Sequence, residues 1–277
     1  MLINGKRLDC ISGADRGLAY GDGLFETLRL YQGRALLLEQ HLERLLLGCR
    51  RLGIELEASL LESDIDQLRP EFSDYGILKL IVTRGQGGRG YRPEPTTRVT
   101  RLASLHPYPQ YTIGTNNPEQ GIAAFLCEQR LALQPALAGI KHLNRLEQVM
   151  ASREWPGDEF MEGLMLDMNG KLIEGTRSNL FLVHKGRLLT PDLQQCGVNG
   201  VLRTELLKSF GTRANVVPCS LQVLLEAEEA FVCNSVFGVW PLLRLHISGR
   251  DQILPCGDYT RQAQHLFEEI LADRHGN

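Results

Sequence analysis

The chain has 277 residues, of which 43% are hydrophobic and 23% are charged, and its formal net charge is −3. These values are ordinary for a soluble globular protein with one large or two modest domains. The small negative charge excludes the general attraction to nucleic acid that a strongly basic composition provides. No segment has the apolar length of a membrane span, and the N-terminus lacks a signal-peptide pattern, so we expect a cytoplasmic protein.

The first half of the chain is typical of short strands and helices. Residues 1–35 contain several glycine-rich turns, and residues 23–31 alternate apolar and polar side chains as a strand does. Leucines recur at helical spacing after residue 36, and Gly53 is a suitable end for that helix. The other elements expected here are helices at 36–53 and 57–69 and strands at 77–83 and near 97–104.

The second half begins after a stretch with linker composition. Residues 113–120 contain glycine, asparagine and proline, so we predict a smaller N-terminal α/β domain at 1–112, an interdomain linker at 113–120, and a larger C-terminal α+β domain at 121–277. The elements expected in the second domain are a strand at 121–127, a helix at 142–154, hairpins at 163–174 and 179–190, a helix from Val201, a strand at 229–233 and a helix at 258–273. These blocks of hairpins and helices predict an α+β fold.

Two local features of the second half carry more specific predictions. The expected helix at 142–154 has an apolar stripe made by Leu143, Leu146, Val149 and Met150. In the hairpin at 163–174, Asn169 and Gly170 favour a tight type I′ turn.

Cysteine and histidine spacing argues against a metal centre. The seven cysteines show no short paired spacing of the kind that a zinc site or a disulfide framework requires. We therefore expect free thiols in a reducing compartment. The seven histidines form no H-E-x-x-H or similar motif, so the sequence predicts no bound metal.

Lys141 is the first candidate for a catalytic residue. It follows the small and apolar residues Ala138–Ile140 at the expected start of a helix. A lysine amine becomes a nucleophile when desolvation or a nearby positive charge lowers its pKa, and Ile140 and Leu143 would form an apolar wall. An isolated lysine in such a position is more often a solvated surface residue.

Glu174 and the segment 197–203 supply two further groups. Glu174 ends a hairpin strand. There its carboxylate would face the ring nitrogen of a pyridine-type cofactor and keep that nitrogen protonated. Gly197 and Gly200 frame a helix start, so the N–H groups of Val201 and Leu202 would face an anion with the helix dipole behind them.

Arg44 and Ser235 would complete an anion site with a guanidinium fork and a hydroxyl. Each of these residues taken alone is more often an ordinary structural or surface residue. Together, an amine, a carboxylate and an anion-binding helix end are what a protein must supply to pyridoxal 5′-phosphate (PLP).

The glycine-rich segment Arg84–Tyr91 follows a strand but is not a dinucleotide fingerprint. Proline-containing residues follow it directly and cannot begin the required helix. We expect Arg89 and Tyr91 to lie on a loop over a small anionic substrate.

The stretch from Ile173 to Arg203 resembles the signature of fold-type IV PLP enzymes, the class that includes branched-chain and D-amino-acid aminotransferases. Within this class, residues 15–23, 83–91 and 137–148 resemble the lyases that act on 4-amino-4-deoxychorismate. The resemblance covers essentially the whole chain.

The resemblance implies a two-domain fold with PLP at the domain interface, a homodimer, and conversion of 4-amino-4-deoxychorismate to p-aminobenzoate and pyruvate in folate biosynthesis. It implies that Lys141 is the Schiff-base lysine and that Glu174 faces the pyridine nitrogen. The phosphate contacts that it implies are Arg44, Ser235 and the amides of Val201 and Leu202. Arg29 and Arg89, with Tyr91 nearby, are candidates for the substrate carboxylates because a guanidinium matches a carboxylate bidentately.

Two alternatives remain open at this point. Residues 174–179 are more similar to the aminotransferase members, so a D-amino-acid or branched-chain aminotransferase on the same scaffold is the main alternative. The second is an RNA-associated module that uses the arginines of 84–92, which the acidic net charge and the complete set of cofactor groups disfavour.

Overall fold

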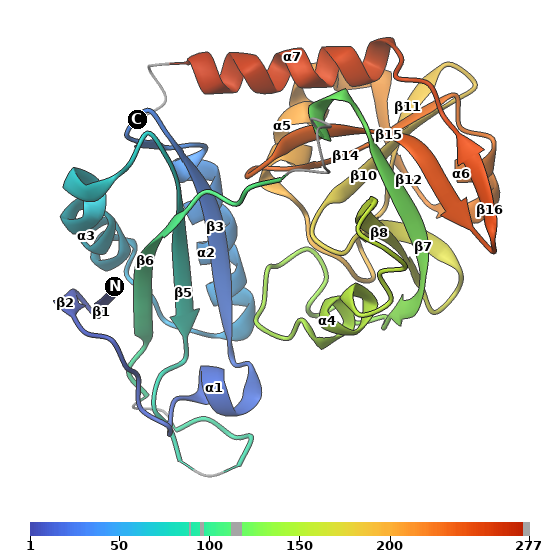
Figure 1. Ribbon diagram of the computed structural model, residues 1–277. Helices are drawn as coiled ribbons and strands as arrows, with labels where there is room; N and C mark the ends of the chain where they lie inside the picture. Colours follow the sequence, from blue (N-terminus) through green and yellow to red (C-terminus); the bar gives the residue numbers. More distant parts are fainter. Residues whose placement is uncertain (89, 95–96, 112–117, 274–277) are drawn as a thin grey trace. The chain divides into compact units, whose positions relative to one another are not determined.

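The computed structural model describes residues 1–88, 90–94, 97–111 and 118–273. These residues fold as two compact units (Figure 1). The first contains Met1–Pro109 and the short segment Ile140–Asn144, and the second contains Gln110–Gly139 and Arg145–Asp273. Residues 140–144 thus pack with the first unit although they belong to the second half of the sequence. Most of the expected linker at 113–120 lies outside the described residues, so the expected domain limits stay a prediction.

The first unit is built on a six-stranded sheet with the strand order β2-β1-β6-β5-β3-β4. Its strands are β1 (Leu2–Ile3), β2 (Lys6–Arg7), β3 (Gly23–Tyr31), β4 (Arg34–Ala35), β5 (Tyr75–Thr83) and β6 (Thr100–Pro107). Its helices are α1 (Arg16–Tyr20), α2 (Leu38–Leu52) and α3 (Ala58–Leu68), followed by the 3₁₀ turn η1 (Arg69–Glu71). The helices expected at 36–53 and 57–69 are confirmed.

One face of this sheet is the hydrophobic core of the first unit. Even-numbered residues of β3 such as Leu24, Leu28 and Leu30 are fully buried, and α2, whose Leu45 and Cys49 are also buried, packs against this strand. The odd-numbered residues of β3 point to the opposite face, where most are only half-buried. One face of β3 is therefore packed into the core, whereas the other is more open, and residues of the candidate site lie on both faces.

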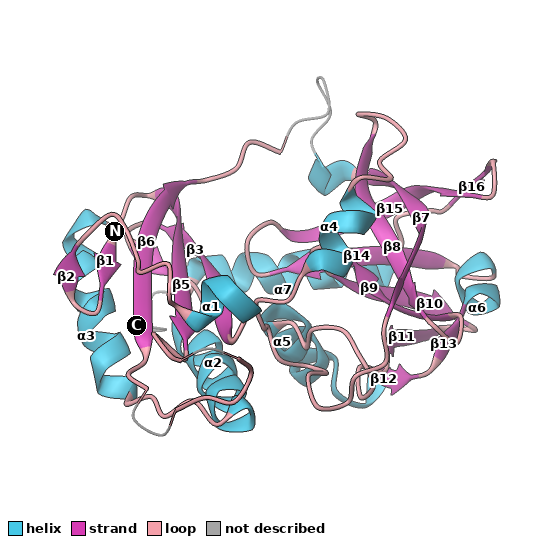
Figure 2. Ribbon diagram, turned by 90° about the horizontal axis from the view of Figure 1, so that it is seen from below, coloured by secondary structure: helices cyan, strands magenta, loops and turns pink. Residues whose placement is uncertain are grey.

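The second unit is built on a ten-stranded sheet with the order β12-β11-β10-β14-β15-β7-β8-β9-β13, in which β16 pairs with β15 and projects from the sheet (Figure 2). Its strands are β7 (Ile122–Leu131), β8 (Phe160–Asp167), β9 (Lys171–Gly175), β10 (Asn179–His184), β11 (Arg187–Pro191), β12 (Ala214–Val217), β13 (Cys219–Ser220), β14 (Glu229–Asn234), β15 (Gly238–Ile247) and β16 (Arg250–Ile253). Its helices are α4 (Leu146–Ser152), α5 (Val201–Phe210), α6 (Leu221–Leu225) and α7 (Asp258–Ala272), with 3₁₀ turns η2 (Pro118–Gln120) and η3 (Gly211–Arg213).

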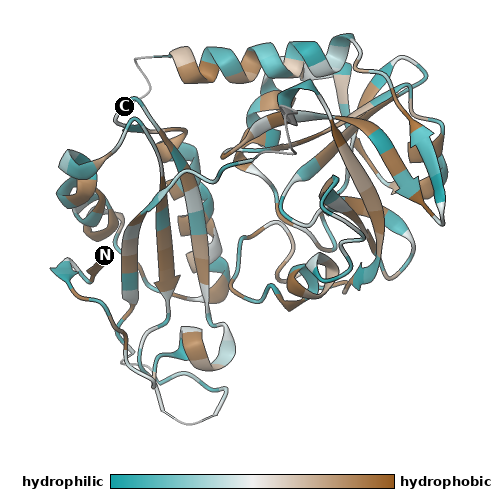
Figure 3. Cartoon of the chain, in the orientation of Figure 1, coloured by the Kyte–Doolittle hydropathy of each residue, from teal (hydrophilic) through white to brown (hydrophobic). Residues whose placement is uncertain are grey.

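Hydrophobic clusters lie on the sheet of the second unit, where apolar colour follows the strands while α7 carries both polar and apolar residues (Figure 3). One cluster surrounds Trp240, which stacks on Phe237. A second joins α5 and α7 to the strands, where Phe181 of β10 stacks on Phe231 of β14 with ring centres 5.0 Å apart. The N-terminus of α5 is thus fixed to the sheet by this packing.

The helix expected at 142–154 is shorter than expected, and its apolar stripe is not buried within the chain. The helix begins at Leu146, and Leu143 belongs to the segment that packs with the first unit. Leu146, Val149 and Met150 are 75%, 54% and 53% exposed. Leu146, Val149 and Met150 share a helical face as predicted, whereas Leu143 does not belong to the helix, and the spacing cannot say what covers that face.

The turn between β8 and β9 differs from the type I′ turn that its Asn-Gly sequence predicts. Gly170 has φ +76° but Asn169 does not have a positive φ, so the expected type I′ turn is wrong. The Asp167 carboxylate explains the difference, since it accepts hydrogen bonds from the N–H groups of Asn169 (2.9 Å) and Lys171 (2.8 Å). The β10–β11 turn, at Lys185 (φ +52°) and Gly186 (φ +69°), has the two positive φ angles of type I′.

All seven cysteines are free, as expected. Across the described parts of the chain, no helix combines the length and the apolar character needed to cross a bilayer.

The core of the first unit gives a stability prediction. Replacing the fully buried Leu28 with Ala removes apolar contacts and leaves a cavity beneath α2, which should lower the free energy of unfolding by about 2–5 kcal/mol. Urea denaturation followed by circular dichroism measures this change. Leu47→Ala is the matched control, because Leu47 is 46% exposed on α2 and should cost less than about 1 kcal/mol. Equal losses in both variants would contradict the assigned burial.

Candidate active site

Lys141 is held by backbone pairing with the first strand residues of β3. The N–H of Phe25 donates to the Lys141 carbonyl (3.0 Å), and the N–H of Leu143 donates to the Gly23 carbonyl (2.9 Å), which are the bonds of an antiparallel bridge. This register places Lys141 opposite Phe25, and the Lys141 Nζ lies 4.5 Å from the centre of the Phe25 ring. The lysine therefore projects from a sheet edge rather than from the helix that follows it.

Glycines at the end of α1 permit this close pairing. A Cβ on Gly23 would lie 2.4 Å from the Val82 carbonyl oxygen and 2.9 Å from Leu143, so no larger residue has room there. Gly21 has φ +64°, and a Cβ on it would lie 2.4 Å from the Asn144 side chain, which instead donates to the Gly21 carbonyl. The sequence Gly21-Asp22-Gly23 is thus required to bring the lysine segment onto β3.

A buried charge cluster occupies the core side of β3. Glu26 is almost fully buried between the strand and α2. Its carboxylate accepts from Arg44 Nε (2.8 Å) and Arg44 Nη2 (2.5 Å), and it lies 2.6 Å from His41 Nδ1. The bidentate bond fixes the plane of the Arg44 guanidinium. Arg44, which we expected to bind phosphate, is therefore oriented by a carboxylate that the sequence analysis missed.

The charges in this cluster are set by burial and by the arginine. Burial alone would raise the pKa of Glu26, but the Arg44 charge and the hydrogen bonds around the carboxylate outweigh it and lower the pKa from 4.5 to about 2. Burial lowers the pKa of His41, and the nearby Lys141 charge also acts in this direction. His41 is therefore neutral at pH 7, with its Nδ1–H facing the Glu26 carboxylate, while the Glu26–Arg44 pair is ionised.

Glu174 is a fixed acceptor in the second unit. It lies at the end of β9 and is buried. Its Oε2 accepts from the Val198 N–H (2.7 Å), and its Oε1 accepts a longer bond from Gln148 Nε2 (3.4 Å). The carboxylate is thereby tied to the loop that leads into α5, so its position and the start of that helix depend on each other.

The turn before α5 is a close-packed backbone structure. Gly200 is the N-cap of α5 and provides no side-chain cap, so the first helical N–H groups, those of Val201 and Leu202, face outward from the helix end. A Cβ on Gly200 would lie 2.0 Å from the Asn179 Oδ1, and the Asn179 amide donates to the Val198 carbonyl (2.8 Å). Ten residues of helix lie behind this end and direct its dipole toward it.

Arg203 and Ser235 belong to the same end of the sheet. The buried Arg203 donates to the side chains of Thr190 (3.1 Å) and Asn199 (2.7 Å), which fixes the loop before α5. Ser235 is buried and follows β14, whose Cys233 pairs directly with Asn179 of β10. Asn179 therefore connects the strand end near Ser235 with the turn before α5.

A family model described as amino-transferase class IV matches residues 23–245. The chain belongs to the class IV aminotransferase family.

Similar proteins in this family include both lyases and aminotransferases. The solved structure of 4-amino-4-deoxychorismate lyase from Pseudomonas aeruginosa has 44% sequence identity and a TM-score of 0.90, and covers 97% of this chain and 98% of its own. Aminodeoxychorismate lyase of Vibrio harveyi is 33% identical over 95% of this chain and 97% of its own length. A putative branched-chain-amino-acid aminotransferase of Methanocaldococcus jannaschii is 29% identical over 97% of this chain and 95% of its own length. The expected fold-type IV architecture is confirmed.

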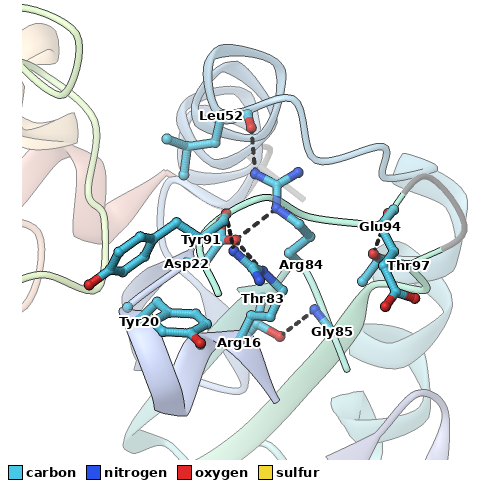
Figure 4. Close-up of polar contacts among 12 residues, drawn as sticks. Arg16, Tyr20, Asp22, Leu52, Thr83, Arg84, Gly85, Tyr91, Glu94 and Thr97 are labelled. Carbon is cyan, nitrogen blue, oxygen red and sulfur yellow. Dashed lines mark hydrogen bonds and ion pairs between the residues drawn. The ribbon is translucent and has the colours of Figure 1, made fainter. Parts of the chain in front are cut away.

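In this class IV aminotransferase chain, an ion network holds the loop after β5 (Figure 4). The Asp22 Oδ2 accepts from Arg16 Nε (2.9 Å) and from Arg84 Nε (2.8 Å). The other nitrogens of Arg16 donate to the Gly90 and Tyr91 carbonyls (2.9 and 2.7 Å), so the network closes the loop against α1. Burial alone would raise the pKa of Asp22, but its bonds to Arg84 and Arg16 outweigh this and lower it.

The expected substrate residues have different surroundings. Arg29 is buried on β3, and its guanidinium carbon lies 5.4 Å from the Tyr31 ring centre and 5.0 Å from that of Tyr108. Tyr91 is 85% exposed and contacts Tyr20 edge-on. Arg89 lies outside the described residues. The structure brings Lys141, Arg44 and Arg29 into the first unit, and Glu174, Val201, Leu202 and Ser235 into the second; their roles stay predictions.

Two residues of the charge cluster could have been found in the sequence. Glu26 occupies an even position between Leu24 and Leu28, where the alternation of β3 predicts an apolar residue. His41 lies three residues after Leu38 and four before Leu45 on the buried face of α2. A carboxylate and an imidazole at buried positions on adjacent elements predict a paired site. Among the described residues, no group of three or more His, Cys, Asp or Glu side chains is placed to hold a metal ion.

Glu26→Gln tests the charge cluster. Removing the carboxylate breaks the ion pair of Glu26 with the partly buried Arg44, which should lower the free energy of unfolding at pH 7 by about 3–5 kcal/mol. Because the pKa of Glu26 is lowered from 4.5 to about 2, its stabilising contribution is complete above pH 4.5 and is lost as the pH falls toward 2. The difference between wild type and variant should therefore shrink at pH 3.

Urea denaturation at pH 7 and pH 3 measures this difference. Glu62→Gln, at an exposed position of α3, is the control and should change stability little at either pH. A Glu26→Gln effect that is the same at both pH values would contradict the ionised pair.

Asp22→Asn tests the ion network of Figure 4. Without the carboxylate charge, the two guanidinium groups repel each other, and the loop should open more often. Amide hydrogen exchange in a peptide covering residues 84–92 should accelerate about tenfold or more, the effect of losing about 1.4 kcal/mol of local stability. Asp66→Asn, which removes an exposed ion pair on α3, should leave this peptide unchanged. Unchanged exchange in both variants would show that other contacts hold the loop.

Proposed function

We propose that this protein is a PLP-dependent lyase that converts 4-amino-4-deoxychorismate to p-aminobenzoate and pyruvate, the step that supplies p-aminobenzoate for folate. The observation that carries the proposal is the 44% identity, over nearly the full length of both chains, to a solved 4-amino-4-deoxychorismate lyase. The aminotransferase relative from Methanocaldococcus jannaschii is less similar, at 29% identity.

The residues of the two units suit PLP. The turn before α5 has no room for a Cβ at Gly200, and its N-terminal amides have no side-chain cap, as a phosphate-binding helix end requires. Arg44 offers a guanidinium that Glu26 already orients. Glu174 offers a carboxylate fixed by the Val198 amide. We assign the phosphate to Arg44, Ser235 and the Val201 and Leu202 amides, and the pyridine nitrogen to Glu174.

Lys141 then carries out the proton transfers of the reaction. Bound PLP withdraws electrons from the carbon that carries the substrate amine and so makes its hydrogen acidic. The Lys141 amine removes the proton from C4 of the substrate. The C3–O bond breaks, the ring becomes aromatic, and Lys141 returns a proton to the departing three-carbon fragment, which leaves as pyruvate. Glu174 stabilises the protonated pyridine nitrogen throughout.

We also propose a cytoplasmic homodimer. The apolar residues Leu146, Val149 and Met150 form an exposed stripe on one face of α4, which an isolated chain would leave in water. Such a stripe is typical of a surface that a second subunit covers. The seven free cysteines are compatible with the reducing conditions of the cytoplasm.

A coupled assay with Lys141→Ala tests the lyase. The PLP-loaded protein is supplied with chorismate, glutamine and an aminodeoxychorismate synthase, and p-aminobenzoate and pyruvate are quantified. We expect equal amounts of both products from the wild type, and a fall of at least about 10²–10⁴-fold in the variant, which lacks the base. Lys171→Ala, at an exposed position of β9, is the control and should retain activity.

The aminotransferase alternative predicts a different result. Sustained glutamate formation from an amino acid and 2-oxoglutarate, with no p-aminobenzoate from the coupled assay, would contradict the lyase. The shared cofactor residues would remain assigned in that case, because both reactions use them.

A further inference from the structure

The open face of the first sheet carries a second lysine beside Lys141. Because directly paired residues share a face, Thr27 of β3, Lys79 of β5 and Ser104 of β6 form a row across the sheet. The neighbouring row contains Phe25, which faces Lys141. The two rows are two residues apart along the strand, a step of about 7 Å.

The two lysines converge on the same aromatic ring. The Lys79 Nζ lies 6.0 Å from the centre of the Phe25 ring, and the Lys141 Nζ lies 4.5 Å from it. The two amines can therefore be no farther apart than the sum of these distances. Lys79 is half-buried, and its amine lies within reach of a ligand that also contacts Lys141.

Lys79 has no acidic partner in the described parts of the chain. No ion pair or hydrogen bond of its side chain is formed there, and the neighbouring Ser104 hydroxyl is bonded to His106 Nε2 (2.8 Å). The paired residues of β3, β5 and β6 on this face include no Asp or Glu. A half-buried ammonium without a counter-charge on a surface that lacks acids is a site for an anionic group.

We propose that Lys79 binds the ring carboxylate of the substrate, the one opposite the reacting amine. This inference rests on the proposed lyase function and deepens it. In 4-amino-4-deoxychorismate the amine and this carboxylate lie at opposite ends of a six-membered ring, which spans the step between the rows of Phe25 and Lys79. Arg29 is farther along β3, four residues or about 13 Å from Phe25, and its guanidinium is held over Tyr31 and Tyr108.

The same geometry makes Lys79 a specificity residue. An α-amino acid carries its carboxylate on the carbon that bears the amine, so a small amino acid bound at Lys141 would leave Lys79 without a partner. A substrate with a distant carboxylate pairs with it instead. Lys79 thus favours the cyclic substrate of a lyase over the substrates of an aminotransferase.

The test measures binding with and without the carboxylate. The dissociation constants of 4-aminobenzoate and aniline are measured by isothermal titration calorimetry on PLP-loaded wild type, Lys79→Met and Lys79→Arg. Wild type should bind 4-aminobenzoate at least about tenfold more tightly than aniline, the usual effect of one charge-assisted contact. Lys79→Met should lose this preference without weaker aniline binding, and Lys79→Arg should keep most of it.

Kinetics and a matched control complete the design. Lys79→Met should raise KM for 4-amino-4-deoxychorismate about tenfold or more and change kcat less, since the carboxylate is bound in both the ground state and the transition state. Lys6→Met, at an exposed position of the edge strand β2, should change neither binding nor kinetics. Circular dichroism and PLP absorbance verify that each variant folds and holds the cofactor.

The outcomes separate this inference from the proposed function. A Lys79→Met variant that keeps the preference for 4-aminobenzoate and an unchanged KM overturns the role of Lys79 while the lyase reaction stands. A wild type that forms p-aminobenzoate but binds aniline as tightly as 4-aminobenzoate also overturns it. If the wild type forms no p-aminobenzoate and binds aniline as tightly as 4-aminobenzoate, both the lyase function and the role of Lys79 are contradicted.

Discussion

The antiparallel bridge between residues 141–143 and the start of β3 is the contact on which the candidate site depends. Two backbone hydrogen bonds join a segment from the second half of the chain to the first sheet, and they fix which face of that sheet Lys141 occupies. Because the side-chain period of a strand is two, a shift of one residue would send the lysine to the opposite face. Gly21 and Gly23 keep this approach free of side chains.

The two faces of β3 carry different groups of the candidate site. On the core face, the Glu26 carboxylate fixes the Arg44 guanidinium within a dry environment, where a bidentate charged bond is well ordered. On the open face, the amines of Lys141 and Lys79 lie near the Phe25 ring, and the paired residues of β3 and β5 around Lys79 include no carboxylate. The strand β3 thus carries on one side the carboxylate that orients Arg44, and lies on the other side beside the amines of Lys141 and Lys79.

In the second unit, the candidate cofactor-binding groups are joined to one another by hydrogen bonds. Glu174 is tied to the loop before α5 by the Val198 amide, and Asn179 ties the same loop to the sheet. The carboxylate and the helix end therefore cannot move independently. This coupling explains why the sequence from Ile173 to Arg203 is a recognisable unit: its residues contact one another in the fold, although they belong to the three strands β9, β10 and β11, the loop that follows them and the start of α5.

The sequence by itself determined most of the elements, the family likeness and the main candidate groups, because strand alternation, helical spacing and glycine-bounded turns are local properties. It did not determine what covers the apolar stripe of α4, which is exposed in the chain, or the type of the Asn169-Gly170 turn, which the Asp167 side chain decides. Nor did it pair Glu26 with Arg44 or place Lys79 beside Lys141. Those relations join residues far apart in the chain, and only the register of β3 with β5 and with the lysine segment, together with the packing of α2, brings them within reach.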